Sequence, residues 1–186
     1  MNRLCHLALL AGLLPTLATA AFARPFTINA DTITTFKGAA IGQIVDQVIW
    51  RGGLVLEAND ADFGGVSGLT FLNPNELVMV TDKGMFVSAR LETDSAGSPL
   101  ALAEANISRI RNSRGNELPP NYSRDAEAVE TLVRNGRVTG VRVGFENLTR
   151  VADFDLMDNH PAGAARSVSI PEELRAFQSN ESLEAV

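Results

Sequence analysis

The stretch Gly65-Val66-Ser67-Gly68-Leu69 is the most informative part of the sequence, because two later stretches repeat its pattern. These are Asp125-Ala126-Glu127-Ala128-Val129 and Ser182-Leu183-Glu184-Ala185-Val186. Their centres, Ser67, Glu127 and Glu184, lie 60 (67 to 127) and 57 (127 to 184) residues apart. A period of this size, with strand-like segments between the copies, is typical of a radial array of β-blades, because one unit cannot bury its own faces. The sequence therefore predicts an all-β, propeller-like fold.

The third copy falls on the last five residues of the 186-residue chain. We therefore expect about two blades and the start of a third. A propeller closes with about four blades or more, so the sequence predicts a truncated chain in which the domain over 24–186 is incomplete at its C-terminus. Two blades with long unpaired edges would be prone to aggregation.

Strand patterns and turn residues fill the two complete units. The alternation predicts antiparallel strands at 68–72, 77–81 and 85–91, and again at 128–133, 138–145 and 150–156. Asn135-Gly136 is the dipeptide most favoured in a two-residue hairpin turn, since both positions need positive φ. We expect exposed loops over 93–99 and 111–120 and a short helical turn over 171–177.

Composition and the N-terminus give the broad class. The chain is 45% hydrophobic and 20% charged, as in soluble globular proteins, and its net charge of −6 gives no reason to expect nucleic acid as a partner. An apolar run over 4–18 after Arg3, ending near Ala21-Phe22-Ala23, predicts a secretory signal peptide over 1–23. We therefore expect a periplasmic or secreted protein with no membrane span after cleavage. Cys5, the one cysteine, would leave with the signal, so no disulfide is expected.

Carboxylates follow the second strand of each unit. Asp82 comes directly after 77–81, and Glu146 directly after 141–145. Equivalent positions of successive propeller blades recur around one axis. The acids Asp82, Glu127, Glu146 and Glu184 are therefore expected to converge on a central channel, although solvated strand ends commonly carry such acids too.

Five motifs in order resemble the phytase-like family, the "esterase-like activity of phytase" proteins. The similarity runs from about Trp50 to Val186. The motifs are Asp62-Phe63-Gly64-Gly65-Val66-Ser67-Gly68-Leu69, Thr81-Asp82-Lys83-Gly84, Arg124-Asp125-Ala126-Glu127-Ala128-Val129, Phe145-Glu146 with Arg150-Val151, and Pro171-x-x-Leu174 with Asn180-x-x-x-Glu184-Ala185. The chain departs from the family at Ser182, where Gly is usual, and at Lys83, where Arg is common.

The resemblance implies a secreted or periplasmic bacterial propeller that hydrolyses phosphate or carboxylic esters of small molecules. By distant analogy with propeller phytases it also implies Ca²⁺, which takes six to eight oxygen ligands and activates a water. The implied metal ligands are Asp82, Asp125, Glu127, Glu146 and Glu184. The implied catalytic residues are Glu127, Glu184 and Arg150, with the planar fork of Arg150 facing an anionic group.

Other functions stay open from the sequence. The chain is also compatible with a propeller that binds a ligand or partner without turnover, or with an inactive fragment. An α/β-hydrolase is disfavoured, because the stretch around Ser67 lacks the second glycine of a nucleophile elbow, so Ser67 is expected to pack or hydrogen-bond. His160 is expected in a turn and without function.

Overall fold

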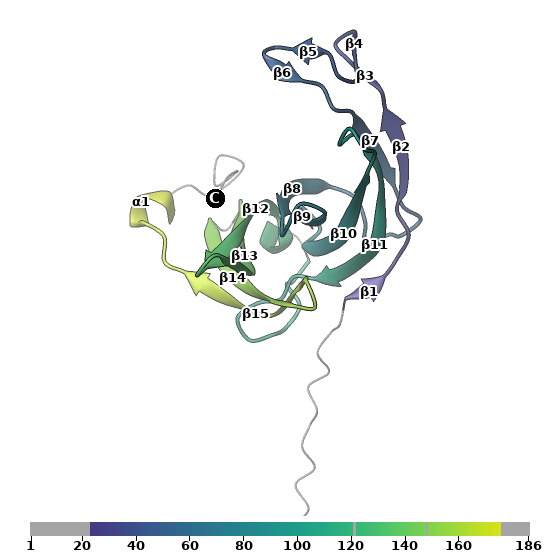
Figure 1. Cartoon of the computed structure of the whole chain (residues 1–186). Helices are drawn as coiled ribbons and strands as arrows, with labels where there is room; N and C mark the ends of the chain where they lie inside the picture. The colour runs from purple at the N-terminus through teal and green to yellow at the C-terminus, as the bar shows by residue number, and fades with distance from the viewer. Residues whose placement is uncertain (1–22, 121, 148, 176–186) are drawn as a thin grey trace, which may run out of the picture.

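The computed structural model describes residues 23–120, 122–147 and 149–175. The described part consists mainly of antiparallel β-strands, with one 3-10 turn, Tyr122–Arg124, and one short helix, α1 (Glu172–Arg175). The all-β class predicted from the sequence is confirmed. Two sheets dominate the structure, and both are open (Figure 1). The predicted signal peptide lies outside the described residues except for Ala23.

The first sheet is a meander with a short additional strand at one edge. In spatial order its strands are β1 (Arg24–Pro25), β11 (Pro99–Arg109), β10 (Met85–Thr93), β9 (Glu76–Thr81) and β8 (Val66–Phe71). The strands predicted at 68–72, 77–81 and 85–91 are confirmed as β8, β9 and β10. β11 has no counterpart among the strands predicted from the sequence.

The second sheet is a four-stranded meander. Its strands are β12 (Ala126–Arg134), β13 (Arg137–Phe145), β14 (Arg150–Met157) and β15 (His160–Val168). The predicted hairpin turn joins β12 to β13, with φ of 51° at Asn135 and 73° at Gly136. His160 begins a strand, which corrects its prediction as a turn residue.

The N-terminal segment forms an arm that packs against the first sheet. β2 (Asn29–Ile33) pairs with β7 (Gly53–Glu57) along the arm. Two small hairpins form its tip and project from the body (Figure 1). These are β3 (Thr35–Phe36) with β4 (Ala39–Ala40), and β5 (Ile44–Val45) with β6 (Val48–Ile49).

Apolar side chains on both faces of the first sheet are buried. One face packs on the second sheet, where the rings of Phe86 and Phe154 meet edge to face with centroids 5.0 Å apart. The other face, with Leu77 and Met79, packs on side chains of the arm, including Leu54 and Leu56. The first sheet is thus the middle layer between the second sheet and the arm. Within the described ranges, none of the helical segments could span a lipid bilayer.

Candidate functional site

A β-bulge lies near the start of β8 in the first sheet. Val66 pairs with Thr81 and Gly68 pairs with Val80, so Ser67 is the additional residue. A bulge re-aims the side chain of its extra residue. The Ser67 hydroxyl donates to a carbonyl oxygen of the neighbouring strand β12. Ser67 therefore makes a structural hydrogen bond between the two sheets, as expected from the sequence.

The second sheet repeats this bulge at the matching position. Ala126 pairs with Phe145 and Ala128 pairs with Gly144, which makes Glu127 the additional residue of β12. The first two copies of the repeated stretch, centred on Ser67 and Glu127, are thus equivalent in structure as well as in sequence. The third copy, centred on Glu184, lies outside the described residues.

Each bulge is closed by an equivalent backbone hydrogen bond. The Asp82 amide donates to the Gly65 carbonyl oxygen at 2.9 Å, and the Glu146 amide donates to the Asp125 carbonyl oxygen at 3.0 Å. In each sheet the bond holds an acidic residue beside the start of the bulged strand. Asp82, after β9, lies beside the start of β8, and Glu146, after β13, lies beside the start of β12. The sequence prediction that Asp82 and Glu146 occupy matching places is confirmed.

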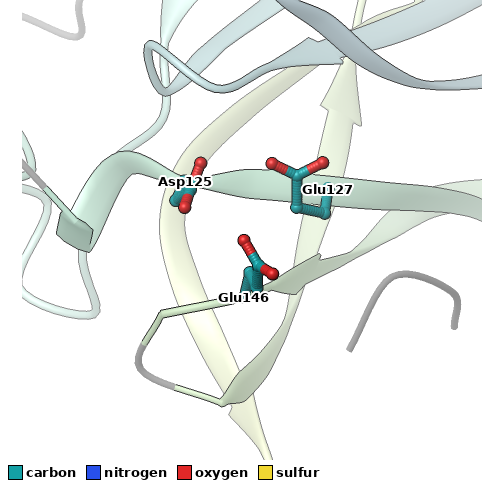
Figure 2. A group of neighbouring side chains, drawn as sticks. All are labelled: Asp125, Glu127 and Glu146. Carbon is teal, nitrogen blue, oxygen red and sulfur yellow. The ribbon is translucent and has the colours of Figure 1, made fainter. Parts of the chain in front are cut away.

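Three carboxyl groups converge at the bulge of the second sheet. Ligand oxygens of Asp125, Glu127 and Glu146 all lie within 4.8 Å of one another. Figure 2 shows the side chains of Asp125, Glu127 and Glu146 grouped where β12 begins and β13 ends. Glu146 is buried, and the other two are partly exposed. Asn147 donates its side-chain amide to Asp125 and so orients that carboxylate.

Crowding of these acids changes the titration of Glu127. Partial burial raises the pKa of Glu127 to about 7, helped by a hydrogen bond with Asp125 and by the negative charges of Asp125, Glu146 and Asp82. Like-charged carboxylates that share one site hold a proton between them unless a cation takes its place. Near neutral pH the cluster therefore holds a proton on Glu127 in part of the molecules.

When no divalent cation is present, the free energy of unfolding should fall by about 1 kcal/mol between about pH 5 and about pH 8. This figure allows for solvent screening at a partly exposed site. The pKa of Glu127 is about 7 in the folded chain and about 4.3 in an unfolded one. The folded state therefore holds a proton that stabilises it at low pH, and this stabilisation is lost as pH rises through 7. Urea unfolding at both pH values measures the change. Glu127→Gln should remove it, and an unchanged fall in that variant would contradict this assignment.

Asp82 stands at the corresponding bulge of the first sheet without neighbouring acids from its own sheet. Gly65, with φ of 64°, occupies the place that Asp125 holds in the second sheet. A Cβ built on Gly65 would overlap the Asp82 carboxylate, so glycine is needed to admit it. Asp82 nevertheless contributes to the raised pKa of Glu127, which places it in the same electrostatic environment.

Arg150, predicted to face an anion, contacts an aromatic ring and a backbone carbonyl oxygen. Its guanidinium stacks on the Phe145 ring at 3.9 Å and donates to the Ser123 carbonyl oxygen at 2.5 Å. Burial lowers the pKa of Arg150. The role of Arg150 toward substrate stays a prediction.

A cavity of about 560 Å³ opens beside the carboxylates. Its lining combines acids, cations and one amide: Asp62, Asp82, Lys83, Arg109, Arg124, Asp125 and Asn147. The sequence pattern predicts no role for these cations, although Lys83 and Arg124 are the direct neighbours of Asp82 and Asp125 in the chain.

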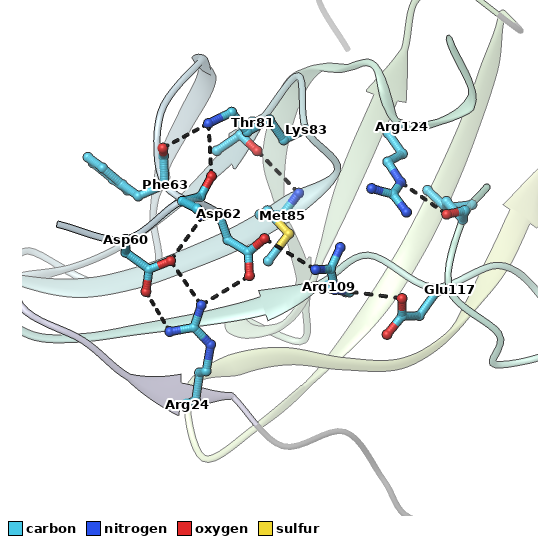
Figure 3. Close-up of polar contacts among 12 residues, drawn as sticks. Arg24, Asp60, Asp62, Phe63, Thr81, Lys83, Met85, Arg109, Glu117 and Arg124 are labelled. Atoms are coloured by element: carbon cyan, nitrogen blue, oxygen red, sulfur yellow. Dashed lines mark hydrogen bonds and ion pairs between the residues drawn. The ribbon is translucent and has the colours of Figure 1, made fainter. Parts of the chain in front are cut away.

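A chain of ion pairs forms one side of this cavity. Asp62 accepts from Arg24 at 3.0 Å and from Arg109 at 3.2 Å, and Arg109 also contacts Glu117 at 3.6 Å (Figure 3). Arg24 pairs further with Asp60 at 2.5 Å, and this contact lowers the pKa of Asp60 to about 2. These ion pairs hold the loop around Asp62 against the first sheet.

Comparison with known proteins gives one match. A family model described as "Phytase-like: Esterase-like activity of phytase" matches residues 61–186, which include both bulges and the carboxylates Asp82, Asp125, Glu127 and Glu146. No curated protein and no solved structure matches the chain.

Proposed function

The chain belongs to the phytase-like family, and we propose on that premise that it hydrolyses phosphate or carboxylic esters of small molecules at the carboxylates of its two bulges. The observation that carries the proposal is the convergence of Asp125, Glu127 and Glu146 within 4.8 Å beside a polar cavity. Acids spread apart around a channel would favour the alternative function, a protein that binds a ligand without turnover. The acids of this site are instead close together.

We propose further that the two sheets are neighbouring blades of a propeller. The strands β8 and β12 each have a bulge at the matching position and lie side by side, which supports this arrangement. In β12, Ala126 and Val129 pack on the preceding sheet. The equivalent residues of β8, Val66 and Leu69, are 43% and 49% exposed, as expected of a face on which another blade packs.

The donor set of the cluster suits a calcium ion. Ca²⁺ takes six to eight oxygen ligands, and carboxylates are its usual partners in proteins. Asp125, Glu127 and Glu146 would hold the ion, and Asp82 adds a carboxylate across the cavity from the first sheet. Glu184 remains a proposed ligand outside the described residues. When bound, the ion supplies a polarised ester oxygen and an activated water.

The protein residues supply orientation and proton transfer. Glu146 is held by its backbone bond to Asp125, and Asp125 by the Asn147 amide, so the two carboxylates are fixed before a ligand arrives. Glu127, with its pKa near 7, is suited to accept or release a proton at neutral pH. We place this chemistry in the periplasm or outside the cell, in keeping with the predicted signal peptide.

Calcium should raise the melting temperature of the full chain. A ligand that binds only the folded state stabilises it by about 2.7 kcal/mol at a concentration about a hundredfold above its Kd. For a chain of this size that corresponds to a rise of about 5 °C or more. Thermal unfolding with and without calcium measures it. Glu146→Gln should lose most of the rise, whereas Asp158→Asn, a change of the same chemistry at an exposed turn, should retain it. A wild-type chain that does not respond to calcium would contradict the metal assignment.

A further inference from the structure

Arg124 is the cation of the cavity for which the described residues supply no partner of opposite charge. Its Nε donates to the Leu118 carbonyl oxygen at 3.0 Å. Among the residues that the structure describes, no carboxylate oxygen lies within 4.0 Å of its guanidinium nitrogens. The remaining donors of the guanidinium therefore carry an unneutralised positive charge at the cavity.

The other two cationic side chains of the cavity already have hydrogen-bond or ion-pair partners. Lys83 donates its ammonium to the carbonyl oxygens of Ala61 at 3.2 Å and Phe63 at 3.0 Å. Arg109 is shared between two carboxylates (Figure 3). Lys83 still carries its charge, because carbonyl oxygens are neutral, but its donors are largely used. An incoming anion would thus find its free donors at Arg124.

The backbone holds Arg124 in place. Gly84, with φ of 74°, lies directly against it, and a Cβ built on Gly84 would approach the Arg124 Cβ to 2.9 Å and its Cγ to 3.0 Å. Gly84 also donates to the Thr81 carbonyl oxygen and accepts from the Ile110 amide. The stem of Arg124 therefore lies across a turn that only glycine accommodates well, and its direction is fixed.

Asp82 lines the same cavity as Arg124. Within the described residues, the Asp82 carboxylate likewise has no cation within 4.0 Å. Two opposite charges that face one cavity without pairing leave room for a ligand between them. A guanidinium offers a planar pair of N–H donors that matches two oxygens of a phosphate or carboxylate group.

We propose that Arg124 is the oxyanion-binding residue of this site, so that the substrate is an ester bearing a phosphate or carboxylate group and not a neutral ester. That the bound anion belongs to a substrate rests on the proposed function. Anion binding by Arg124 itself does not depend on calcium or on catalysis. Arg124 directly precedes Asp125 of the carboxylate cluster, just before β12 begins, which would place the bound anion beside the reacting ester.

Equilibrium dialysis of the full chain with labelled inorganic phosphate and, separately, labelled acetate tests the site, each with and without calcium. We expect Arg124→Gln to weaken binding of the preferred anion at least tenfold and Arg124→Lys to weaken it less, since lysine keeps the charge and loses the fork. Arg114→Gln, at an exposed loop position, is the matched control and should bind like the wild type. Tighter binding of phosphate assigns phosphate groups, and tighter binding of acetate assigns carboxylates.

Gly84→Ala tests the position of Arg124 with its charge kept. We expect it to weaken anion binding as Arg124→Gln does, with the folded state checked by circular dichroism. The proposal is overturned if neither anion binds the wild-type chain, or if Arg124→Gln binds as tightly as the wild type. A calcium titration of the same samples separates the two ideas: lack of calcium binding contradicts the metal site, whereas loss of anion binding in Arg124→Gln still supports the oxyanion site.

Discussion

Replacing Glu127 with glutamine is expected to lower the rate of ester hydrolysis about a thousandfold, within the range found when a positioned acid–base group is removed. Glu127 is the bulged residue of β12, so its side chain is directed away from the ladder and toward Asp125 and Glu146. Glutamine has the same shape but neither carries a proton for transfer nor holds a cation as tightly. Hydrolysis of a chromogenic phosphate ester and of a chromogenic carboxylic ester, with calcium present, measures the effect.

Glu130 provides the matched control on the same strand. It lies opposite Arg142 in the ladder and contacts that residue at 3.7 Å, away from the carboxylate cluster. Glu130→Gln should keep most of the activity. If Glu127→Gln retains wild-type hydrolysis, the assignment of the cluster as the reacting centre is wrong.

Phe154→Ala should cost about 3–5 kcal/mol of unfolding free energy, as for other buried aromatic truncations. Phe154 is 1% exposed and packs edge to face on Phe86 of the first sheet. Its removal leaves a cavity between the two sheets and takes away the aromatic contact that joins them. Urea unfolding followed by circular dichroism gives the change.

Val133→Ala is the comparison for this stability change, because Val133 is 60% exposed near the end of β12. It should cost about 0.5 kcal/mol or less. A loss below about 1 kcal/mol for Phe154→Ala would mean that the two sheets do not share a core as the structure shows.

The matching copies around Ser67 and Glu127 were the most informative part of the sequence. They placed the carboxylates at equivalent sites of two sheets, because both the spacing and the residue after the second strand recur. The sequence did not show that these two residues are bulged. A bulge depends on the partner strand, and no local residue pattern marks it here.

The outer strands were harder to predict. β11 is rich in alanine and contains Glu104 at a φ of 54°, and the register of its pairing shifts nearby, so the two-residue alternation is interrupted. β15 begins with His160-Pro161 and contains Gly163, residues that disfavour strands in isolation. Tertiary pairing overrides these local preferences.

The cations of the cavity could not be assigned from the sequence for a different reason. Arg124 and Lys83 were each adjacent to a predicted ligand, but their function depends on which charges surround them. Lys83 is bound by carbonyl oxygens of a loop twenty residues away in the chain. Among the described residues, Arg124 has no carboxylate beside it, which only the folded arrangement reveals.

Calcium titration of the full chain by calorimetry, repeated at about pH 7 in two buffers of different ionisation enthalpy, tests the central claim most directly. Because the pKa of Glu127 is about 7, about half a proton should leave the protein for each ion bound. Glu127→Gln should bind calcium more weakly and release no proton. Absence of calcium binding by the wild type, or proton release unchanged by Glu127→Gln, would contradict the account.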